Sequence, residues 1–226
     1  MFNTLAKKSG LAKERFIEIA MFAPQWAALI ESYVNYEGLE DAVWWIHAHT
    51  KDEHWEVSHE VREIWNAKVA EKTPLSSSDL VDGAVDVVWF QTIYQQLKKA
   101  KWSVVLAAAK FASASGGHKR AELFARAMLK QATKTEITSR IKSKRHQDSV
   151  RALGLLPLAN GKAREKDLLS RYELFKEFVR QSKQFGSQRQ ASEKRCAQIG
   201  SENLARTAGY ADPCLLYTSP SPRDRG

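Results

Sequence analysis

The sequence predicts an all-α fold, built as an irregular, solenoid-like array of helices. Apolar residues recur at three- and four-residue intervals along most of the chain, which is the period of an amphipathic helix. No two runs of alternating residues flank a hairpin turn signal, so nothing in the sequence indicates a β-sheet. Brief connections join the successive helical segments, and no fixed repeat length is detectable. We therefore expect a layered helical array without a regular period.

In the N-terminal half, apolar stripes and local stop signals predict helices over residues 16–20, 26–34, 39–49, 55–69 and 84–100. Pro24 separates the first two helices, because proline removes a backbone donor and clashes with the preceding turn. Thr73-Pro74 ends the fourth helix, and the capping and turn residues 76–83 precede the fifth. Trp44, Trp45 and Trp89 lie on apolar stripes, so we expect them to anchor an N-terminal core.

In the C-terminal half, the same reasoning predicts helices over residues 102–112, 119–132, 136–145, 165–183 and 187–207. Gly116 and Gly117 follow Ser115 and provide a turn after the first of these helices. Residues 154–161 form a loop that contains Pro157 and Gly161. Gly209 follows the last helix and is expected to close it, since glycine adopts the left-handed conformation of helix ends.

Composition excludes several classes of protein. The chain has 226 residues, of which 43% are hydrophobic and 27% are charged, as in an ordinary globular protein. The mean hydropathy is −0.45 and no apolar run approaches the ~20 residues that a membrane-spanning helix needs. The N-terminus lacks the pattern of a signal peptide, and two cysteines cannot build a disulfide framework. We therefore expect a cytoplasmic protein with no membrane partner.

Charge divides the chain into an acidic and a basic half. Residues 1–100 hold 10 Lys and Arg against 15 Asp and Glu, whereas residues 101–213 hold 23 against 10. All seven tryptophans lie in the acidic half or at its edge, and the two halves are expected to form one continuous helical domain. Clustered Lys and Arg raise affinity for polyanions, so an acidic protein or a nucleic acid is an expected partner. Alternatively, the two halves face each other, or the basic half faces a missing acidic region.

Two basic clusters are the candidate contact residues. They comprise Arg140, Lys142, Lys144 and Arg145, followed by His146, and Lys183, Arg189, Lys194 and Arg195 around Phe185. Arg189 and Lys194 are five residues apart and do not share a clean helical stripe, which argues against a DNA-recognition helix. A charge run of this kind is usually a solvated face, and contact with phosphates or an acidic partner is the functional alternative.

Chemical motifs in the sequence are incomplete. His47, His49, His54 and His59 lie within 13 residues, but residues two or five apart do not share a helix face, so we expect structural or capping roles. His47 and His49 are the candidates if a metal binds. The segment from Gly154 to Lys162 lacks the spacing of a phosphate loop and its Ser or Thr. No catalytic motif is complete, so the catalytic residues are unknown and we predict no metal and no cofactor.

The last 13 residues differ abruptly from the rest. Residues 214–226 form a stretch rich in Ser and Pro that is unrelated to the charged helical sequence before it. Their reverse translation resembles a transposase adapter used in short-read sequencing. We therefore expect a read-through artefact joined to a truncated natural gene, and a tail that packs against nothing. Cys196, the cysteine outside this tail, is expected to be an inert packed residue.

Four segments of the chain carry a family resemblance. They are residues 20–26, 39–52, 182–195 and 202–212, of which the last two are the most specific. These segments resemble an internal part of large bacterial proteins that carry domain of unknown function 4132 and a neighbouring helical region, domain of unknown function 5724. The resemblance covers residues 16–213. It implies association with a WGR module and the label of molybdate metabolism regulator that some of these proteins bear, and it transfers no catalytic residues.

The resemblance and the motifs together leave two hypotheses for function. The first is an uncharacterised helical scaffold or interaction region of a larger bacterial regulatory protein, with the missing remainder of the full-length chain as a partner. The second is part of an enzyme or nucleic-acid-associated protein, whose site is completed by missing C-terminal sequence. Gln184, Gln188 and Gln190 suit either hypothesis, since they can satisfy backbone groups at a helix junction or orient a ligand.

Overall fold

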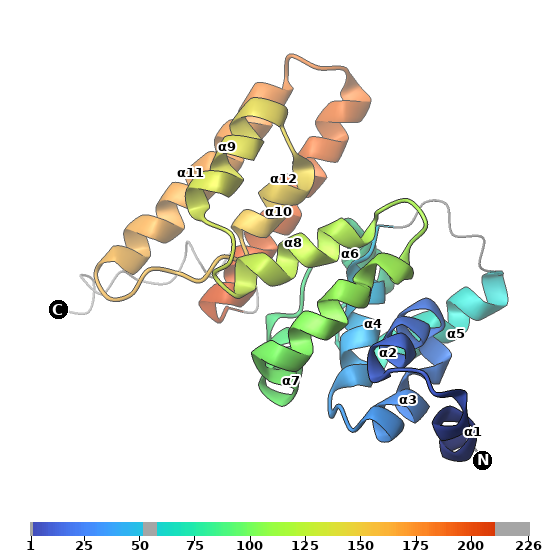
Figure 1. The fold of residues 1–226 in the computed structure, drawn as a ribbon. Coiled ribbons are helices and arrows are strands. Elements are labelled where there is room, and N and C mark those ends of the chain that lie inside the picture. Colours follow the sequence, from blue (N-terminus) through green and yellow to red (C-terminus); the bar gives the residue numbers. More distant parts are fainter. Residues whose placement is uncertain (1, 52–57, 211–226) are drawn as a thin grey trace. The chain divides into compact units, whose positions relative to one another are not determined.

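The computed structural model describes residues 2–51 and 58–210 and confirms the all-α fold. Within these residues there are twelve α-helices and two short 3-10 helices, and no β-strand (Figure 1). The helices form two compact units. Unit 1 comprises Met1–Val81 and Val88–Glu122, and unit 2 comprises Asp82–Val87 and Leu123–Gly226. Solenoid-like stacking of the whole array stays a prediction.

Eight α-helices come first along the chain, seven of them wholly or mainly in unit 1. They are α1 (Phe2–Ser9), α2 (Lys13–Phe22), α3 (Ala27–Val34), α4 (Leu39–His49), α5 (His59–Ala70), α6 (Ser77–Asp82), α7 (Val87–Ala108) and α8 (His118–Met128), with 3-10 turns at Pro24–Trp26 and Ala109–Ala112. Helix α1 was not predicted; it is short, and Ala6 is its one buried residue. The predicted helix boundary near residue 100 corresponds to a kink at Lys98, where φ is 57° and ψ is 175°, so α7 consists of two helical segments that meet there.

An aromatic core holds unit 1 together. Trp44, Trp45 and Trp89 are buried, as predicted. The Trp45 ring lies 4.8 Å from the ring of Phe90 and 6.1 Å from that of Trp102, measured between centroids. Such rings bury a large apolar area, so helices α4 and α7 are joined mainly by the hydrophobic effect.

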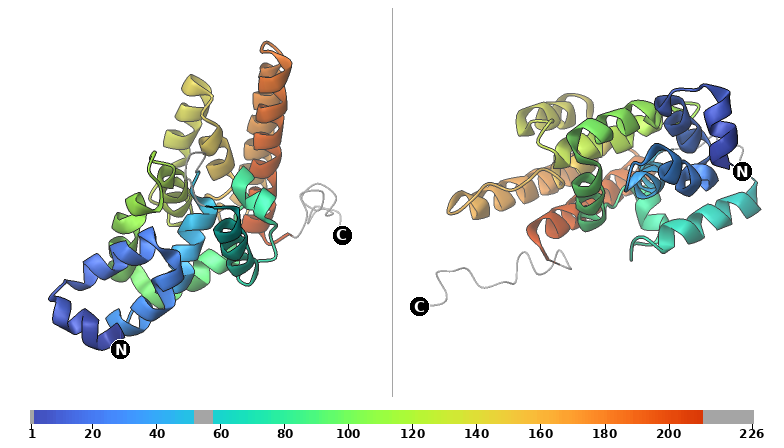
Figure 2. Two further views of the ribbon diagram at one scale, coloured as in Figure 1. Left: turned by 90° about the vertical axis from the view of Figure 1, so that its right-hand side faces the viewer. Right: turned by 60° about the horizontal axis from the view of Figure 1, so that its bottom comes forward.

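Four further helices build most of unit 2. They are α9 (Lys134–Lys144), α10 (Gln147–Leu153), α11 (Ala163–Ser182) and α12 (Ser187–Ala208). Helices α11 and α12 form an antiparallel hairpin, which Figure 2 shows from two further sides. Helix α10 was not predicted from the sequence, whereas the predicted closure of α12 at Gly209 is confirmed by a φ of 86° at this glycine.

Glycines allow α10 and α12 to pack with their backbones in close contact. A Cβ atom at Gly154 would lie 2.2 Å from the carbonyl oxygen of Gly200, and one at Gly200 would lie 2.9 Å from that of Val150. Real Cβ atoms do not approach oxygen so closely, so both positions require glycine. Gly154, which the sequence analysis compared with a phosphate loop, therefore serves helix packing.

A buried amide of α12 binds the backbone of the segment Asp82–Val87. The side chain of Asn203 accepts a hydrogen bond from the Val85 N–H at 2.9 Å. It also donates to the carbonyl oxygens of Gly83 at 3.1 Å and Arg151 at 3.3 Å. Asn203 and Val85 are fully buried, so these hydrogen bonds satisfy groups that water cannot reach.

Some of the predictions fall on residues that the structure does not describe. The predicted artefact at residues 214–226 lies outside the described residues, as do His54 and Trp55. Across the described part of the chain, none of the helices combines the length and apolar character needed to cross a membrane.

Candidate polyanion-contact surface in unit 2

The histidines proposed as metal candidates contact backbone carbonyls and aromatic rings. The Nε2 atom of His47 lies 2.8 Å from the Met21 carbonyl oxygen, and Nδ1 of His49 lies 2.7 Å from that of Trp45. The His49 ring also packs 4.5 Å from the Trp45 ring. Among residues 2–51 and 58–210, no group of three or more His, Cys, Asp or Glu side chains is placed to hold a metal ion.

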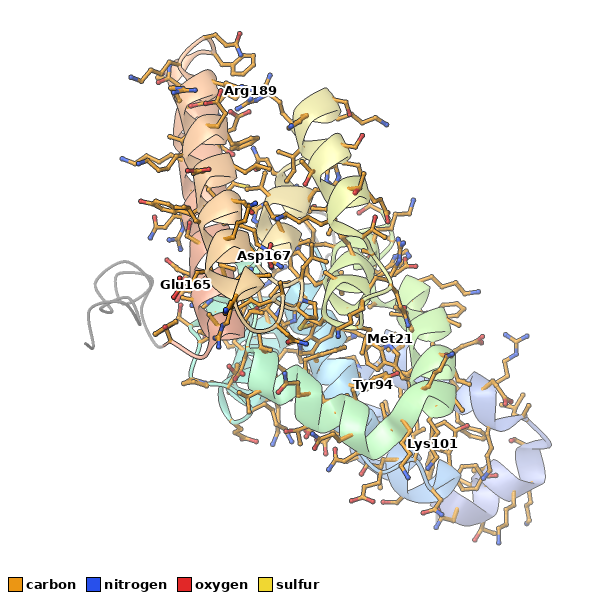
Figure 3. All side chains as sticks on the ribbon, turned by 90° about the vertical axis from the view of Figure 1, so that its left-hand side faces the viewer. Met21, Tyr94, Lys101, Glu165, Asp167 and Arg189 are labelled. Atoms are coloured by element: carbon orange, nitrogen blue, oxygen red, sulfur yellow. The ribbon has the colours of Figure 1, made fainter. Side chains whose placement is uncertain are left out.

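The fold brings the two predicted basic clusters to one end of unit 2. The first cluster lies at the C-terminal end of α9, and the second spans the turn from α11 to α12. Arg145 links them, because its Nη1 donates to Gln181 at 3.1 Å and its Nε donates to Glu193 at 3.0 Å. Figure 3 shows Arg189 at this end of the hairpin. We call this surface the basic end and define it by Arg140, Lys142, Lys144, Arg145, Lys183, Arg189 and Lys194.

Arg145 is turned inward by an unusual backbone conformation. With φ at 48°, it caps α9 in the left-handed region. Its guanidinium group contacts Glu193 through two hydrogen bonds, the shorter of which is 2.6 Å, and donates to the Phe178 carbonyl oxygen at 2.7 Å. The same group lies 4.2 Å from the centroid of the Phe178 ring. Through these contacts, Arg145 joins α9 to the α11–α12 hairpin.

Glu193 is the buried acceptor at the centre of this network. Its side chain is fully buried, and it also accepts a hydrogen bond from Nε of Arg189 at 3.0 Å. Burial alone would raise the pKa of Glu193, but hydrogen bonds and charge from Arg145 and Arg189 outweigh it and hold the pKa below its ordinary value of 4.5. The carboxylate is therefore ionised at neutral pH and holds two of the predicted contact arginines in place.

Phe185, the aromatic side chain inside the second basic cluster, is covered by arginine. The Arg189 guanidinium lies 3.7 Å from the Phe185 ring centroid, and that of Arg145 lies 5.2 Å away. Both distances fall within the range of cation–π contacts. The ring therefore packs against arginine side chains within the protein.

Arginines and lysines have different roles at this end. Arg195 pairs with Asp82 at 2.7 Å, so the structure places it outside the basic end. Arg140 lies 3.5 Å from the His146 ring, and His146 in turn caps α10 by accepting the Ser149 N–H at 3.1 Å. The side chains of four lysines are exposed and make no ion pair or hydrogen bond to a described residue; they are Lys142, Lys144, Lys183 and Lys194.

The charge of the whole chain resides in unit 2. Unit 1 contains 14 Lys and Arg and 14 Asp and Glu, so it has no net charge. Unit 2 contains 21 Lys and Arg and 12 Asp and Glu, which accounts for the full net charge of +9. The change in composition at residue 100 falls within α7, whereas the last of the three boundaries between the units follows residue 122.

Sequence reasoning did not identify Glu193 as a member of the site. The spacing of Arg189 and Glu193 places them one helical turn apart, which indicates an ion pair. However, exposed pairs share this spacing, and the second partner of Glu193 is Arg145, 48 residues earlier. Gln190 donates to the Phe185 carbonyl oxygen at 2.6 Å, so its side chain satisfies a backbone group at the helix junction.

Comparison with known proteins identifies one family. A family model described as a family of unknown function (DUF5724) matches residues 1–217 of this chain. The match includes both basic clusters and the first four residues of the predicted artefact. No curated protein and no solved structure matches the chain.

Proposed function

Since this chain belongs to the family of unknown function DUF5724, we propose its role from the geometry of unit 2. It is a helical interaction region whose basic end contacts an acidic protein surface. In this proposal the region acts as a scaffold within a larger bacterial regulatory protein. Association with domain of unknown function 4132 and a WGR module belongs to the same proposal.

The observation that carries this proposal is that arginines and lysines have different roles at the basic end: the arginines bind within the protein and the lysines are exposed. Arg145 and Arg189 are engaged by the buried Glu193, and they hold the helix ends that present the four exposed lysines. Lysine side chains are flexible, strongly hydrated cations, which suits salt-dependent contact with carboxylates on another surface. Unit 2 also has excess positive charge, which would attract an acidic partner over a distance comparable to the Debye length.

An acidic protein is favoured over single-stranded nucleic acid by the position of Phe185. Surfaces that bind single strands usually offer exposed aromatic rings on which bases stack. Here the Phe185 ring contacts Arg145 and Arg189. Duplex DNA requires no stacking ring, so it is the competing partner that an experiment must distinguish.

Binding of a labelled poly-glutamate peptide tests the proposal. The full chain is titrated by fluorescence anisotropy at low and at physiological salt, beside a labelled DNA duplex of equal charge. We expect the peptide to bind at low salt and to weaken as salt rises. Replacing four lysines with glutamine should weaken binding at least about fourfold, since each exposed charge contact contributes ~0.2–1 kcal/mol. The substitutions are Lys142→Gln, Lys144→Gln, Lys183→Gln and Lys194→Gln.

A matched variant controls for the loss of four charges. It carries glutamine at four exposed lysines of unit 1, namely Lys7, Lys8, Lys51 and Lys99. The control should bind the peptide as the parent does. Absence of peptide binding at low salt, or equal weakening in both variants, would show that the basic end is not the contact surface. Tighter binding of the duplex, with a logarithmic salt slope of about −0.9 per phosphate contacted, would identify DNA as the partner and overturn the proposal.

A further inference from the structure

A second site lies at the other end of unit 2. A hollow of about 730 Å³ opens between the turn that precedes α9, the loop before α11 and the first turns of α11 itself. Figure 3 shows Asp167, which lines it, well separated along the α11–α12 hairpin from Arg189. Arg171, which lines the hollow, and Lys183 of the basic end are 12 residues apart, which is roughly 18 Å along a helix that rises ~1.5 Å per residue. The hollow and the basic end share no residue.

We propose that this hollow binds a small, doubly charged organic anion, such as a phosphate monoester with an apolar body. Its lining combines four cations, Lys130, Lys134, Lys166 and Arg171, with a single carboxylate, that of Asp167. Its volume lies within the range of small-molecule sites, ~300–1,000 Å³. The charges and the apolar floor together define the class of ligand.

Arg171 and Asp167 form the fixed wall of the site. The Arg171 side chain is 2% exposed and donates to the carbonyl oxygens of Leu153, Leu156 and Pro157. It also donates twice to Asp167, at 3.2 and 2.6 Å. All five N–H groups of this guanidinium are therefore engaged, so Arg171 holds the loop against α11 and does not bind a ligand directly.

Asp167 remains ionised and neutralises one of the four cations. Burial alone would raise the pKa of Asp167, but hydrogen bonds from Lys134 and Arg171 outweigh it and lower the pKa below its ordinary value of 3.8. Asp167 also accepts the Ala159 N–H at 3.2 Å, which fixes the floor of the hollow. Three positive charges remain in excess around the lining.

Those three charges belong to lysines with donors to spare. Lys134 donates to Asp167 and to Ser170, both at 2.8 Å, which leaves one of its three N–H groups. Lys130 and Lys166 are exposed and have no ion pair or hydrogen-bonding side-chain partner within the described ranges. The first turn of α11 adds the partial positive charge of a helix N-terminus, because Ala163 also lines the hollow. A ligand with two negative charges would match this excess.

The floor of the hollow explains why the ligand has an apolar body. It is formed by the loop 156–159, whose side chains are those of Leu, Pro, Leu and Ala, together with Ala132 and Ala163. A bare inorganic ion would leave this floor in contact with water. An aromatic or aliphatic group would cover it and contribute ~25 cal/mol for each Å² of apolar surface buried.

Calorimetric titration of the full chain with phenyl phosphate tests the inference. Three comparison probes each lack one feature of phenyl phosphate. Inorganic phosphate lacks the apolar body, benzoate lacks the second negative charge, and phenol is uncharged. We expect phenyl phosphate to bind at least about fivefold more tightly than inorganic phosphate or benzoate, and phenol to bind more weakly still. Equal affinity for phenol would show an apolar hollow without selectivity for anions and would overturn the proposal.

Substitutions locate the binding. Lys130→Gln combined with Lys166→Gln removes two exposed charges and no described ion pair, and it should weaken phenyl phosphate binding at least about fivefold. Lys142→Gln combined with Lys183→Gln removes the same charge from the basic end and should leave the affinity unchanged. Equal affinities in the parent and the Lys130/Lys166 variant, with unchanged circular dichroism, would refute the site. The same variant should bind poly-glutamate as the parent does, so failure here is distinct from failure of the proposed function.

Discussion

Replacing Arg145 by methionine tests whether the buried carboxylate network holds unit 2 together. Methionine keeps most of the length of the side chain, but it removes the charge and every hydrogen bond to Glu193, Gln181 and Phe178. Glu193 is fully buried, and its remaining partner, Arg189, is 48% exposed. Removing one partner of a buried ion pair usually destabilises a protein by 3–5 kcal/mol. Because Arg189 still contacts the carboxylate, we expect a loss of about 3 kcal/mol.

Urea unfolding measures this loss with an internal reference. All seven tryptophans belong to unit 1, so tryptophan fluorescence reports on that unit, whereas far-ultraviolet circular dichroism reports on both. Hydrogen exchange of peptides from α11 and α12 then reports on unit 2 alone. We expect Arg145→Met to lower the stability of α11 and α12. Adding Glu193→Gln should restore part of the loss, because the buried group is then neutral.

A matched arginine shows whether the effect depends on burial. Arg180 pairs with Glu177 on the same hairpin, but its side chain is 75% exposed. Arg180→Met should therefore change stability by less than about 0.5 kcal/mol. The reasoning fails if Arg145→Met stays within about 0.5 kcal/mol of the parent, or if both variants lose the same amount.

Three other predictions concern unit 2. Its stability should fall as the pH drops below 4.5, because the pKa of Glu193 is lowered in the folded state. The stabilisation is lost as the pH passes through that lower value. Urea titrations from pH 6 to 2.5 should therefore show a shallower decline of the unfolding free energy in Glu193→Gln than in the parent. Gly200→Ala should destabilise the unit by ~1–3 kcal/mol in thermal melts, because the new Cβ would lie 2.9 Å from both the Phe175 ring and the Val150 carbonyl oxygen. Gly186→Ala meets no atom within 4 Å and should cost less than Gly200→Ala, about 0.5–1 kcal/mol, because alanine is a poorer helix N-cap than glycine. Iodoacetamide should not modify Cys196 in the native protein, since burial raises the pKa of its thiol to about 12; rapid alkylation detected by peptide mass spectrometry would contradict this.

Amphipathic helices were the readily predicted part of the fold. In α4 and α7, long rows of apolar residues repeat with the helical period, so the sequence indicates both the helix and the face that packs into the core. The helix α10 was missed because it has seven residues and begins with polar side chains after His146, an uncommon N-cap. Its stability comes from burial of Val150, Ala152 and Leu153 in unit 2, which no local signal indicates.

The candidate surface was located by sequence, but its internal arrangement was not. Charge clustering identified the residues of the basic end, yet it treated Arg145 and Lys144 as equivalent neighbours. The structure separates them, since Arg145 reaches Glu193 and Lys144 remains exposed. A pairing across 48 residues depends on how helices pack, so no local spacing reports it.

The motifs that carry the family resemblance also have structural roles. Arg189 and Glu193 lie within residues 182–195, and Asn203 lies within residues 202–212. Glu193 and Asn203 are both fully buried and hydrogen-bonded to side chains or backbone of other elements. Their identities are therefore constrained by polar groups that need partners inside unit 2.

The route of the chain affects how unit 2 is made on the ribosome. Val85 belongs to unit 2, yet its hydrogen-bond partner Asn203 is synthesised 118 residues later. At a synthesis rate of ~5–20 residues per second, the segment that contains Val85 is made roughly 6 to 24 s before Asn203. Unit 1 can fold in the meantime, because both of its segments, Met1–Val81 and Val88–Glu122, are made before most of unit 2. A polypeptide that started at residue 123 would lack Gly83 and Val85, so its Asn203 amide would emerge without two of the backbone groups that it binds.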